Sequence, residues 1–173
     1  YKAGELHTIG VMAKDAAGLL KDGFQISKTT DMVMNMCILP SSATPSSPLA
    51  DIRVRRAVEY AINKQELVDG LTYGYGVATN QEFCLPPYMD PTTVGYPFDL
   101  AKSKQLLTEA GYPNGIKISA YQVDMMPDDL PLALQGQLKK AGIDLELEKV
   151  GYIKFVNMIQ GGEGWEGYVW SYG

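Results

Sequence analysis

The second half of the chain alternates between helical and strand-like patterns, and this alternation constrains the fold most. Over residues 99–172, apolar residues recur first at helical spacing and then at every second position, in repeated succession. Asp99 is suited to begin a helix, and Gly111 and Gly142 are suited to end one. The expected order is helix 99–110, strand 116–120, helix 128–141, strand 143–148, helix 152–160 and strand 165–172. The alternation predicts an α/β fold with short right-handed crossovers.

Residues 49–71 predict a pair of helices. Asp51 is a good N-cap, and one apolar stripe follows it at helical spacing: Val54, Ala57, Val58, Ala61 and Ile62. Asn63 followed by Glu66 has the spacing of a capping box that begins a second, shorter helix. On spacing alone this is an ordinary helix pair on a core. The basic residues that lie largely off the stripe are expected to form solvated or inter-element salt links and not a ligand clamp, with one of them facing a second lobe as an alternative: Arg53, Arg55 and Arg56.

The first 48 residues predict a helix followed by extended chain. Helical spacing runs over residues 14–21 and stops near Gly23, and alternation then predicts a strand over residues 24–30. Residues 31–39 continue as an extended run with three methionines on one face. The Pro- and Ser-rich residues 40–48 are expected to form an exposed loop, which is a connection and not a domain boundary.

Size and charge indicate an ordinary globular domain. A chain of 173 residues can bury a sizeable core, so one domain over residues 1–173 is expected. The net charge of -5 and the pI near 4.9 argue against nucleic acid as a partner, because no basic stripe is present to neutralise phosphates. No apolar run approaches the length that spans a bilayer. Because the chain opens at Tyr1 without an initiator Met, it reads as an excerpt from a longer polypeptide.

The two cysteines leave their pairing open. Cys37 and Cys84 form no CxxC pair, and they fit either a disulfide of an exported protein or two separate buried thiols. The methionines of residues 31–39, together with Cys37 and His7, are soft ligand types. A methionine stripe on a strand is more typical of an adaptable core. We therefore expect no metal site and no cofactor.

Several segments, in order along the chain, resemble motifs of the family 5 extracellular solute-binding proteins. Residues 49–71 are similar to a signature of that family, and His7 stands where its Gly-Glu-Leu-Asp motif has Asp. The further similar segments are residues 1–6, 76–80, 85–88, 96–113 and 137–147. The resemblance implies a type II periplasmic-binding-protein-like fold, with a mixed sheet flanked by helices, and this chain would be most of the C-terminal lobe. In peptide-binding members, an acidic segment beyond the position of Gly173 helps to hold the amino group of the ligand.

Residues 73–97 are rich in Gly, Pro and Tyr, and an irregular segment of this length is unusual in a compact domain unless it has a function. Its aromatic faces and amide groups suit a cleft that holds a peptide backbone, or alternatively they pack on the surface of the lobe itself. The end of the last strand should also approach the cleft, although a strand tryptophan is more often part of a core. The candidate ligand-binding residues are Tyr73, Tyr75, Gln81, Phe83, Tyr88, Trp170 and Tyr172.

An enzyme has little support in this sequence. There is one His, no nucleophile elbow and no phosphate loop, and helix capping explains the pair Asp128 and Asp129, so no catalytic residue is expected. Ile159 and Val169 stand roughly where some oligopeptide-binding relatives place arginines, which speaks against a classical oligopeptide ligand.

The resemblance implies the solute-binding component of an ABC importer. Such a component captures a peptide or peptide-like solute between two lobes and delivers it to a membrane permease. Its expected partners are the solute, the N-terminal lobe of the same polypeptide and the permease. Its expected location is extracytoplasmic, either periplasmic or lipid-anchored on the outer face of the membrane. Two alternatives stay open, a signalling or scaffold module that has kept this lobe for protein contact and a small α/β enzyme domain.

Overall fold

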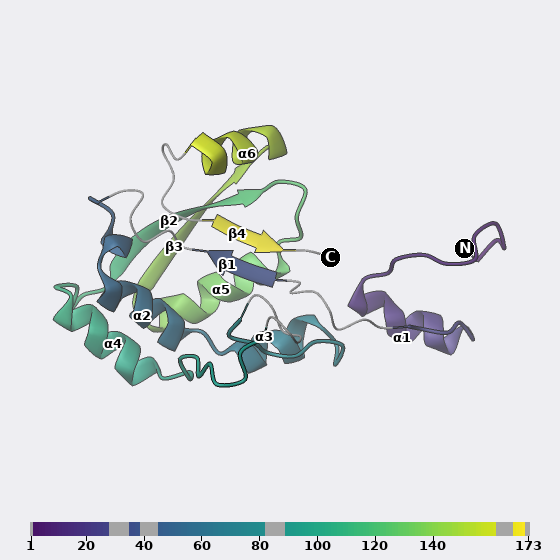
Figure 1. Ribbon diagram of the computed structural model, residues 1–173, viewed down its shortest axis with the longest axis horizontal. Coiled ribbons are helices and arrows are strands. Elements are labelled where there is room, and N and C mark those ends of the chain that lie inside the picture. Colours follow the sequence, from purple (N-terminus) through teal and green to yellow (C-terminus); the bar gives the residue numbers. More distant parts are fainter. Residues whose placement is uncertain (1, 28–34, 39–44, 82–88, 162–167, 172–173) are drawn as a thin grey trace.

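One mixed sheet organises the part of the chain that the structure describes, which is residues 2–27, 35–38, 45–81, 89–161 and 168–171 (Figure 1). The sheet consists of β1 (Asn35–Ile38), β2 (Ile116–Val123), β3 (Ile143–Val150) and β4 (Tyr168–Ser171). Its strand order is β1-β4-β2-β3, with β2 parallel to both β3 and β4, and β1 antiparallel to β4. The helical elements are α1 (Ala13–Lys21), η1 (Pro48–Ala50), α2 (Ile52–Ala61), α3 (Lys64–Leu71), α4 (Leu100–Glu109), α5 (Asp129–Lys140) and α6 (Tyr152–Gly161). This arrangement confirms the predicted α/β fold with a mixed sheet flanked by helices.

The parallel pair β2 and β3 is the centre of the core. The strands pair in continuous register from Ile116 opposite Ile143 to Val123 opposite Val150. On one face, Ile118 and Leu145 are buried under α5, which crosses from β2 to β3. The other face is polar over the first part of the strands, where Lys117 lies 2.6 Å from Glu146. Alternation of buried and exposed residues therefore follows the predicted period of two.

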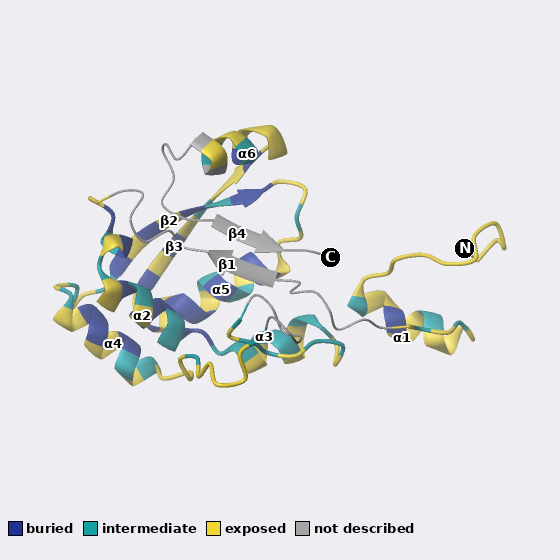
Figure 2. Ribbon diagram, in the orientation of Figure 1, coloured by how far each residue is buried: buried dark blue, intermediate teal, exposed yellow. Residues whose placement is uncertain are grey.

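Helices α2, α4 and α5 enclose the main core on the buried face of the sheet (Figure 2). The apolar stripe predicted for α2 is buried from Val54 to Ile62. Helix α4 packs closely against α2. Where the two helices meet, the buried Ser103 hydroxyl donates a 2.7 Å hydrogen bond to the Ala57 carbonyl. Leu106 and Leu107 of α4 contribute to the same core. A buried hydroxyl needs such a partner, so this bond helps to fix the distance between the two helices.

The predicted caps of α2 and α4 are confirmed, and the cap of α3 is confirmed with one difference. The carboxylates of Asp51 and Asp99 accept hydrogen bonds from backbone N–H groups of α2 and α4, and Asn63 Oδ1 accepts one from Glu66 N at 3.1 Å. In a full capping box Glu66 would accept a bond from Asn63 N. Here Asn63 N donates to Gln137 Oε1 at 2.8 Å instead. A buried amide of α5 thus completes the cap of α3 and joins the two helices.

Two of the three basic residues of α2, Arg53 and Arg55, bond to neighbouring groups in the structure. Arg53 pairs with Asp51 at 2.6 Å and also donates a 2.6 Å bond to the Glu109 carbonyl at the end of α4. Arg55 donates to the carbonyls of Leu49 and Ala50. The pKa of the Asp51 carboxyl lies below its ordinary value, chiefly because Arg53 donates to it. These arginines are therefore occupied in joining neighbouring elements.

The N-terminal segment, residues 2–27, extends away from the sheet (Figure 1). The predicted helix is present as α1, and Gly23, with φ of 87°, follows its end. Of the strand predicted over residues 24–30, residues 24–27 are not in a strand, and the remaining three lie outside the described residues. The physical reason is that Phe24 N donates to the Leu19 carbonyl, which turns the chain back over the end of the helix.

Candidate functional site

The carboxyl ends of three parallel strands meet at one edge of the sheet. β2 ends at Val123, β3 at Val150 and β4 at Ser171, and the pairing of these strands places their ends together (Figure 1). In open α/β sheets, ligands bind in the crevice outside the carboxyl ends of the strands. The candidate functional site therefore lies at this edge, which we call the carboxyl edge: residues 122–128, Lys149, and residues 151–153 at the start of α6.

A hydrogen-bond network holds the loop between β2 and α5 in place. The buried Gln122 donates through Nε2 to Asp128 Oδ1 at 2.8 Å, and Lys149 Nζ lies 2.7 Å from Asp128 Oδ2. Backbone bonds from Asp124 N to the Val150 carbonyl and from Met126 N to the Val123 carbonyl complete the turn. The Lys149 ammonium, followed by the Gln122 amide, holds the pKa of the Asp128 carboxyl below its ordinary value.

This network corrects the sequence-based interpretation of Asp128. The residue does stand at the N-cap position of α5, but its carboxylate accepts no bond from the helix backbone. Its two oxygens are already taken by Gln122 and Lys149, which approach from the strands. Asp129 lies in the first turn of α5, where a negative charge is favourable.

The surface of the carboxyl edge combines one free carboxylate with exposed apolar groups. Within the described residues, the exposed Asp124 side chain makes no hydrogen bond or ion pair. Met125 is 68% exposed beside it, and Tyr152 and Ile153 are exposed at the start of α6. Both α5 and α6 begin at this edge, so their first backbone N–H groups point outward from it. The edge can therefore contact a solute that has positive, negative and apolar parts.

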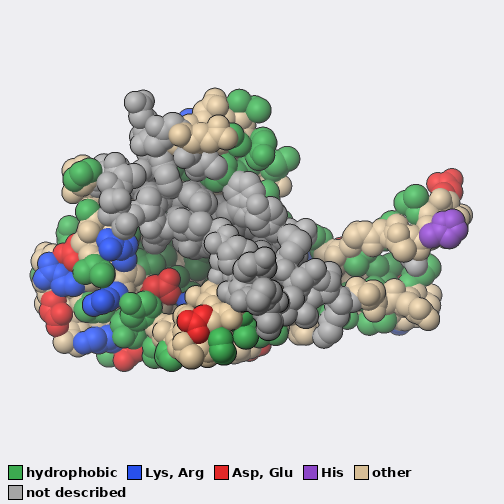
Figure 3. Space-filling view, in the orientation of Figure 1, with side chains coloured by type: hydrophobic (Ala, Val, Ile, Leu, Met, Phe, Trp, Pro, Cys, Tyr) green, Lys and Arg blue, Asp and Glu red, His purple; other side chains and the backbone are tan. Residues whose placement is uncertain are grey.

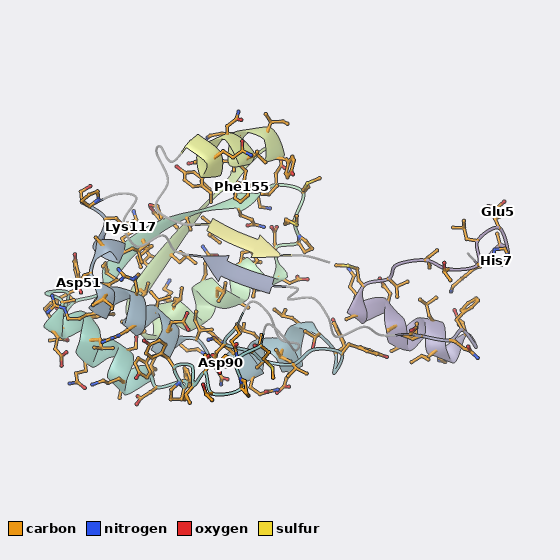
Figure 4. All side chains as sticks on the ribbon, viewed as in Figure 1. Glu5, His7, Asp51, Asp90, Lys117 and Phe155 are labelled. Atoms are coloured by element: carbon orange, nitrogen blue, oxygen red, sulfur yellow. The ribbon has the colours of Figure 1, made fainter. Side chains whose placement is uncertain are left out.

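A small second core supports the edge from beneath. Phe155 of α6 is 1% exposed and packs with Val123 and Val150, the last residues of β2 and β3 (Figure 4). Tyr121 and Met126 partly cover the cluster. Because Phe155 anchors α6 to the strand ends, the exposed residues at the start of that helix are held at a fixed place on the edge.

The residues predicted from the irregular segment do not gather at the carboxyl edge. Tyr73 is 60% exposed with a positive φ of 52°, and Tyr75 is half-buried. Gln81 has a structural partner: its side chain donates to the Asp90 carbonyl at 2.7 Å and accepts from Asp90 N at 2.8 Å. Asp90 and Phe155 lie on opposite sides of the sheet (Figure 4). The two regions are thus separate in the described chain.

Of the remaining four predicted ligand-binding residues, the structure describes only one, and only its backbone. Phe83, Tyr88 and Tyr172 lie outside the described residues, and for Trp170 the structure describes the backbone, which pairs with Met36. A ligand-binding role for the seven candidates therefore stays a prediction. The carboxyl edge itself was missed as a whole, although its signal was present: polar residues stand directly after a predicted strand and before a predicted helix.

The described residues hold no group of three His, Cys, Asp or Glu side chains that could bind a metal ion. His7 is exposed in the N-terminal segment, and the side chains of Met36 and Cys37 are outside what the structure describes. Cys84 is as well, so the pairing of the two cysteines stays open. In the described ranges, no helix combines the length and the apolar character that crossing a bilayer requires.

Comparison with known sequences shows the family. Residues 2–171 match the bacterial extracellular solute-binding proteins, family 5 Middle. Di/tripeptide-binding protein 1 of Pseudomonas aeruginosa is 28% identical over 183 residues, which covers 96% of this chain and 33% of the relative. Heme-binding protein A of Haemophilus influenzae is 38% identical over 78 residues, covering 43% of this chain and 14% of the relative. The chain thus spans a third or less of the length of these relatives.

Solved structures show the same fold. The periplasmic binding protein DppA of Helicobacter pylori, in complex with the peptide STSA, superimposes with a TM-score of 0.80 at 24% identity, covering 94% of this chain and 31% of DppA. NikA of Staphylococcus aureus, in complex with Ni(L-His)2, gives a TM-score of 0.75 at 20% identity, covering 94% and 35%. Both have the type II periplasmic-binding-protein fold. The family consists of substrate-binding proteins of ABC transporters and not of enzymes. With residues 2–171 matched, the chain belongs to the family 5 bacterial extracellular solute-binding proteins.

Proposed function

We propose that this chain supplies one side of the solute cleft in a two-lobed binding protein, and that the solute is a peptide or a peptide-like molecule. In this proposal residues 1–173 belong to the C-terminal lobe, and an N-terminal lobe of the same polypeptide closes the cleft. An ABC membrane permease receives the loaded protein. The protein works outside the cytoplasm, either in the periplasm or lipid-anchored on the outer face of the membrane.

The observation that carries the proposal is the free Asp124 carboxylate, on the loop between β2 and α5 and close to Gly151, which precedes α6. A peptide has a positive amino group and a negative carboxylate, separated by backbone amides. Asp124 supplies an acceptor for the positive group, and the N-terminus of α6, whose first turn holds no acidic residue, favours the negative one. Support for a peptide also comes from the di/tripeptide-binding protein of Pseudomonas aeruginosa, which matches nearly the whole chain.

A second lobe is part of the proposal because the carboxyl edge is open to solvent. Met125, Tyr152 and Ile153 are exposed, so a solute placed here is covered on one side only. Small-molecule sites normally bury most of the surface of their ligand. Closure of two domains around the solute provides the missing cover, and part of the binding free energy is then used to bring the domains together.

Isothermal titration calorimetry on the full-length gene product tests the proposal. The solutes are a set of dipeptides and tripeptides, and a nickel–histidine complex and heme are titrated separately as alternative solutes. We expect binding of peptides, and we expect Asp124→Asn to weaken it about 10- to 100-fold, because a hydrogen bond to a charged group is lost.

Asp144→Asn is the matched control. Asp144 is an exposed carboxylate near the amino end of β3, a strand's length from the carboxyl edge, so its replacement should leave peptide affinity unchanged. Binding of the nickel complex or heme but of no peptide would overturn the solute class. An equal effect of both substitutions would remove Asp124 from the site.

A further inference from the structure

An open pocket of about 370 Å³ lies at the amino ends of β2 and β3, at the other end of these strands from the carboxyl edge. It is formed by the second half of α4, the last turn of α5 and the turns that lead from these helices into β2 and β3. Its polar lining residues come from both sides: Lys104, Thr108, Tyr112, Asn114, Lys139 and Lys140. Among the residues that the structure describes, no Asp or Glu lines it. The pocket is therefore a positively charged hollow in a chain whose net charge is -5.

The three lysines of this pocket have no carboxylate partner in the described chain. Lys104, Lys139 and Lys140 are exposed, and none of their ammonium groups forms a hydrogen bond or ion pair with a described residue. Figure 3 shows Lys and Arg side chains gathered at the end of the molecule where α2 and α4 lie, with Asp and Glu side chains among them. Four other lysines of the α/β body do pair with carboxylates: Lys64, Lys117, Lys149 and Lys154. The pocket thus gathers the lysines whose charge is not compensated.

The ends of the helices explain only part of this arrangement. Lys139 and Lys140 lie in the last turn of α5, where a positive charge is favourable beside the helix carbonyls. Lys104 is in the middle of α4, so the same reason does not apply to it. Three ammonium groups around one pocket repel one another, and a bound anion would remove that repulsion. The arrangement is therefore better suited to holding an anion than to stabilising the helices.

Two glycine turns hold the sides of the pocket at a fixed separation. Gly115 and Gly142 have positive φ angles of 94° and 86°. Ile116 N donates to the Gly142 carbonyl at 2.9 Å, which joins the turn before β2 to the turn before β3. A Cβ at Gly115 would collide with that same carbonyl oxygen, so the close approach requires glycine. The ends of α4 and α5, which these turns follow, are thereby held in place around the pocket.

We propose that this pocket binds a phosphate group, either of a free anion or of an anionic lipid headgroup. Lysine binds phosphate groups as a compact positive charge with three hydrogen-bond donors. Tyr112 and Asn114 add neutral polar groups to the lining. The volume of about 370 Å³ lies at the lower end of the range of small-molecule sites. The inference goes beyond the proposed function, because the pocket is a strand's length from the carboxyl edge and needs no solute there.

Two probes distinguish the sources of the phosphate, both applied to the full-length gene product. Inorganic pyrophosphate, titrated by calorimetry, tests a free anion. Cosedimentation with vesicles of equal parts phosphatidylglycerol and phosphatidylcholine tests a lipid headgroup, with vesicles of phosphatidylcholine alone as the blank. We expect at least one probe to bind, and we expect added salt to weaken the binding, because the attraction is between charges.

The double variant Lys139→Gln with Lys140→Gln should weaken this binding about 10-fold or more, because two charge-assisted contacts are lost. Lys14→Gln with Lys21→Gln is the matched control, since it removes the same charge from two lysines of α1 outside the pocket and should leave binding unchanged. All four lysines are exposed, so both variants should fold, and thermal unfolding verifies this.

A selective loss of pyrophosphate binding in the pocket variant would support the inference and identify a free anion. A selective loss of vesicle binding alone would support it and identify a lipid headgroup. Absence of binding by both probes overturns the inference. An equal loss in the two double variants also overturns it, because the binding would then depend on the overall charge of the protein and not on the pocket.

Discussion

Strand β2 and the stretch of residues 8–12 carry similar apolar patterns but differ in burial and in backbone pairing. In β2, Ile118 is 1% exposed, and the whole strand is paired with β3. In residues 8–12, Ile9 and Val11 are exposed and the backbone is almost unpaired. An apolar pattern therefore determines whether a segment is able to form a buried strand, and the presence of a pairing partner determines whether it forms one. The α/β body supplies its own partners, and the N-terminal segment does not.

The largest difference in stability is expected when one isoleucine is replaced in each region. Ile118→Ala should destabilise residues 1–173 by about 2–5 kcal/mol, because it leaves a cavity in a closely packed core. Ile9→Ala should change the free energy of unfolding by less than about 0.5 kcal/mol, as is usual for surface sites. Urea unfolding followed by circular dichroism measures both. Similar losses for the two variants would mean that the N-terminal segment is packed after all.

A second, smaller effect concerns the buried amide that ties α3 to α5. Gln137→Ala should lower the free energy of unfolding by about 1–3 kcal/mol, because Asn63 N then loses its acceptor in a partly buried place. Gln135→Ala is the control within the same helix: Gln135 is half-buried and donates one bond to the Leu145 carbonyl, so a smaller loss is expected. The same urea unfolding experiment compares them. Equal losses would refute the special role of Gln137.

The tie between Asn63 and Gln137 also shows where sequence reasoning stops. The caps at Asp51, Asp99 and Asn63 were predictable because each depends on residues two or three positions apart. Gln137 lies 74 residues from Asn63, and no local pattern connects the two. The helices and the period of the strands follow from short-range spacing, whereas the strand order β1-β4-β2-β3 depends on contacts across the whole chain.

The candidate site was hidden for the same reason. Asp124 and Asp128 are unremarkable in sequence, and they become neighbours of Gly151 and Lys149 only when β2 and β3 lie side by side. Sequence reasoning instead favoured the aromatic residues of the irregular segment. One of its candidates, Gln81, binds the backbone of Asp90, a partner nine residues away that composition does not reveal. The family, in contrast, was predictable, because ordered motifs carry that information.

A third prediction concerns strain at the margin of the body. Tyr73 has a φ of 52°, a conformation that costs a residue with a side chain about 1 kcal/mol and glycine almost nothing. Glycine loses more conformational entropy on folding than tyrosine, which offsets part of this gain. Tyr73→Gly should therefore raise the free energy of unfolding of residues 1–173 by about 0.5 kcal/mol. Tyr75 has no positive φ, so Tyr75→Gly relieves no strain and should lower the free energy of unfolding. Thermal unfolding of the two variants checks this, and destabilisation by both would show that the Tyr73 ring contributes packing that outweighs the strain.

The smallest expected effect is a pH dependence at the carboxyl edge. Because the pKa of Asp128 is lower in the folded state than in the unfolded chain, its pairing contributes stability above the unfolded pKa, and that contribution is lost as the pH falls through the folded value. Lys149→Met should raise the Asp128 pKa, as measured by NMR titration of the carboxyl carbon. Lys154→Met removes a lysine that pairs with Glu148 and should leave it unchanged. An unchanged Asp128 pKa in the Lys149 variant would contradict the network.

The most direct test of a two-lobed solute site compares solute binding by the full-length gene product and by residues 1–173 in the same calorimeter. We expect a peptide to bind the full-length protein and residues 1–173 to bind it at least about 100-fold more weakly, because a site formed by closure is incomplete in one part alone. Equal affinity in the two proteins would contradict a site shared between two lobes, since the whole site would then lie within these 173 residues.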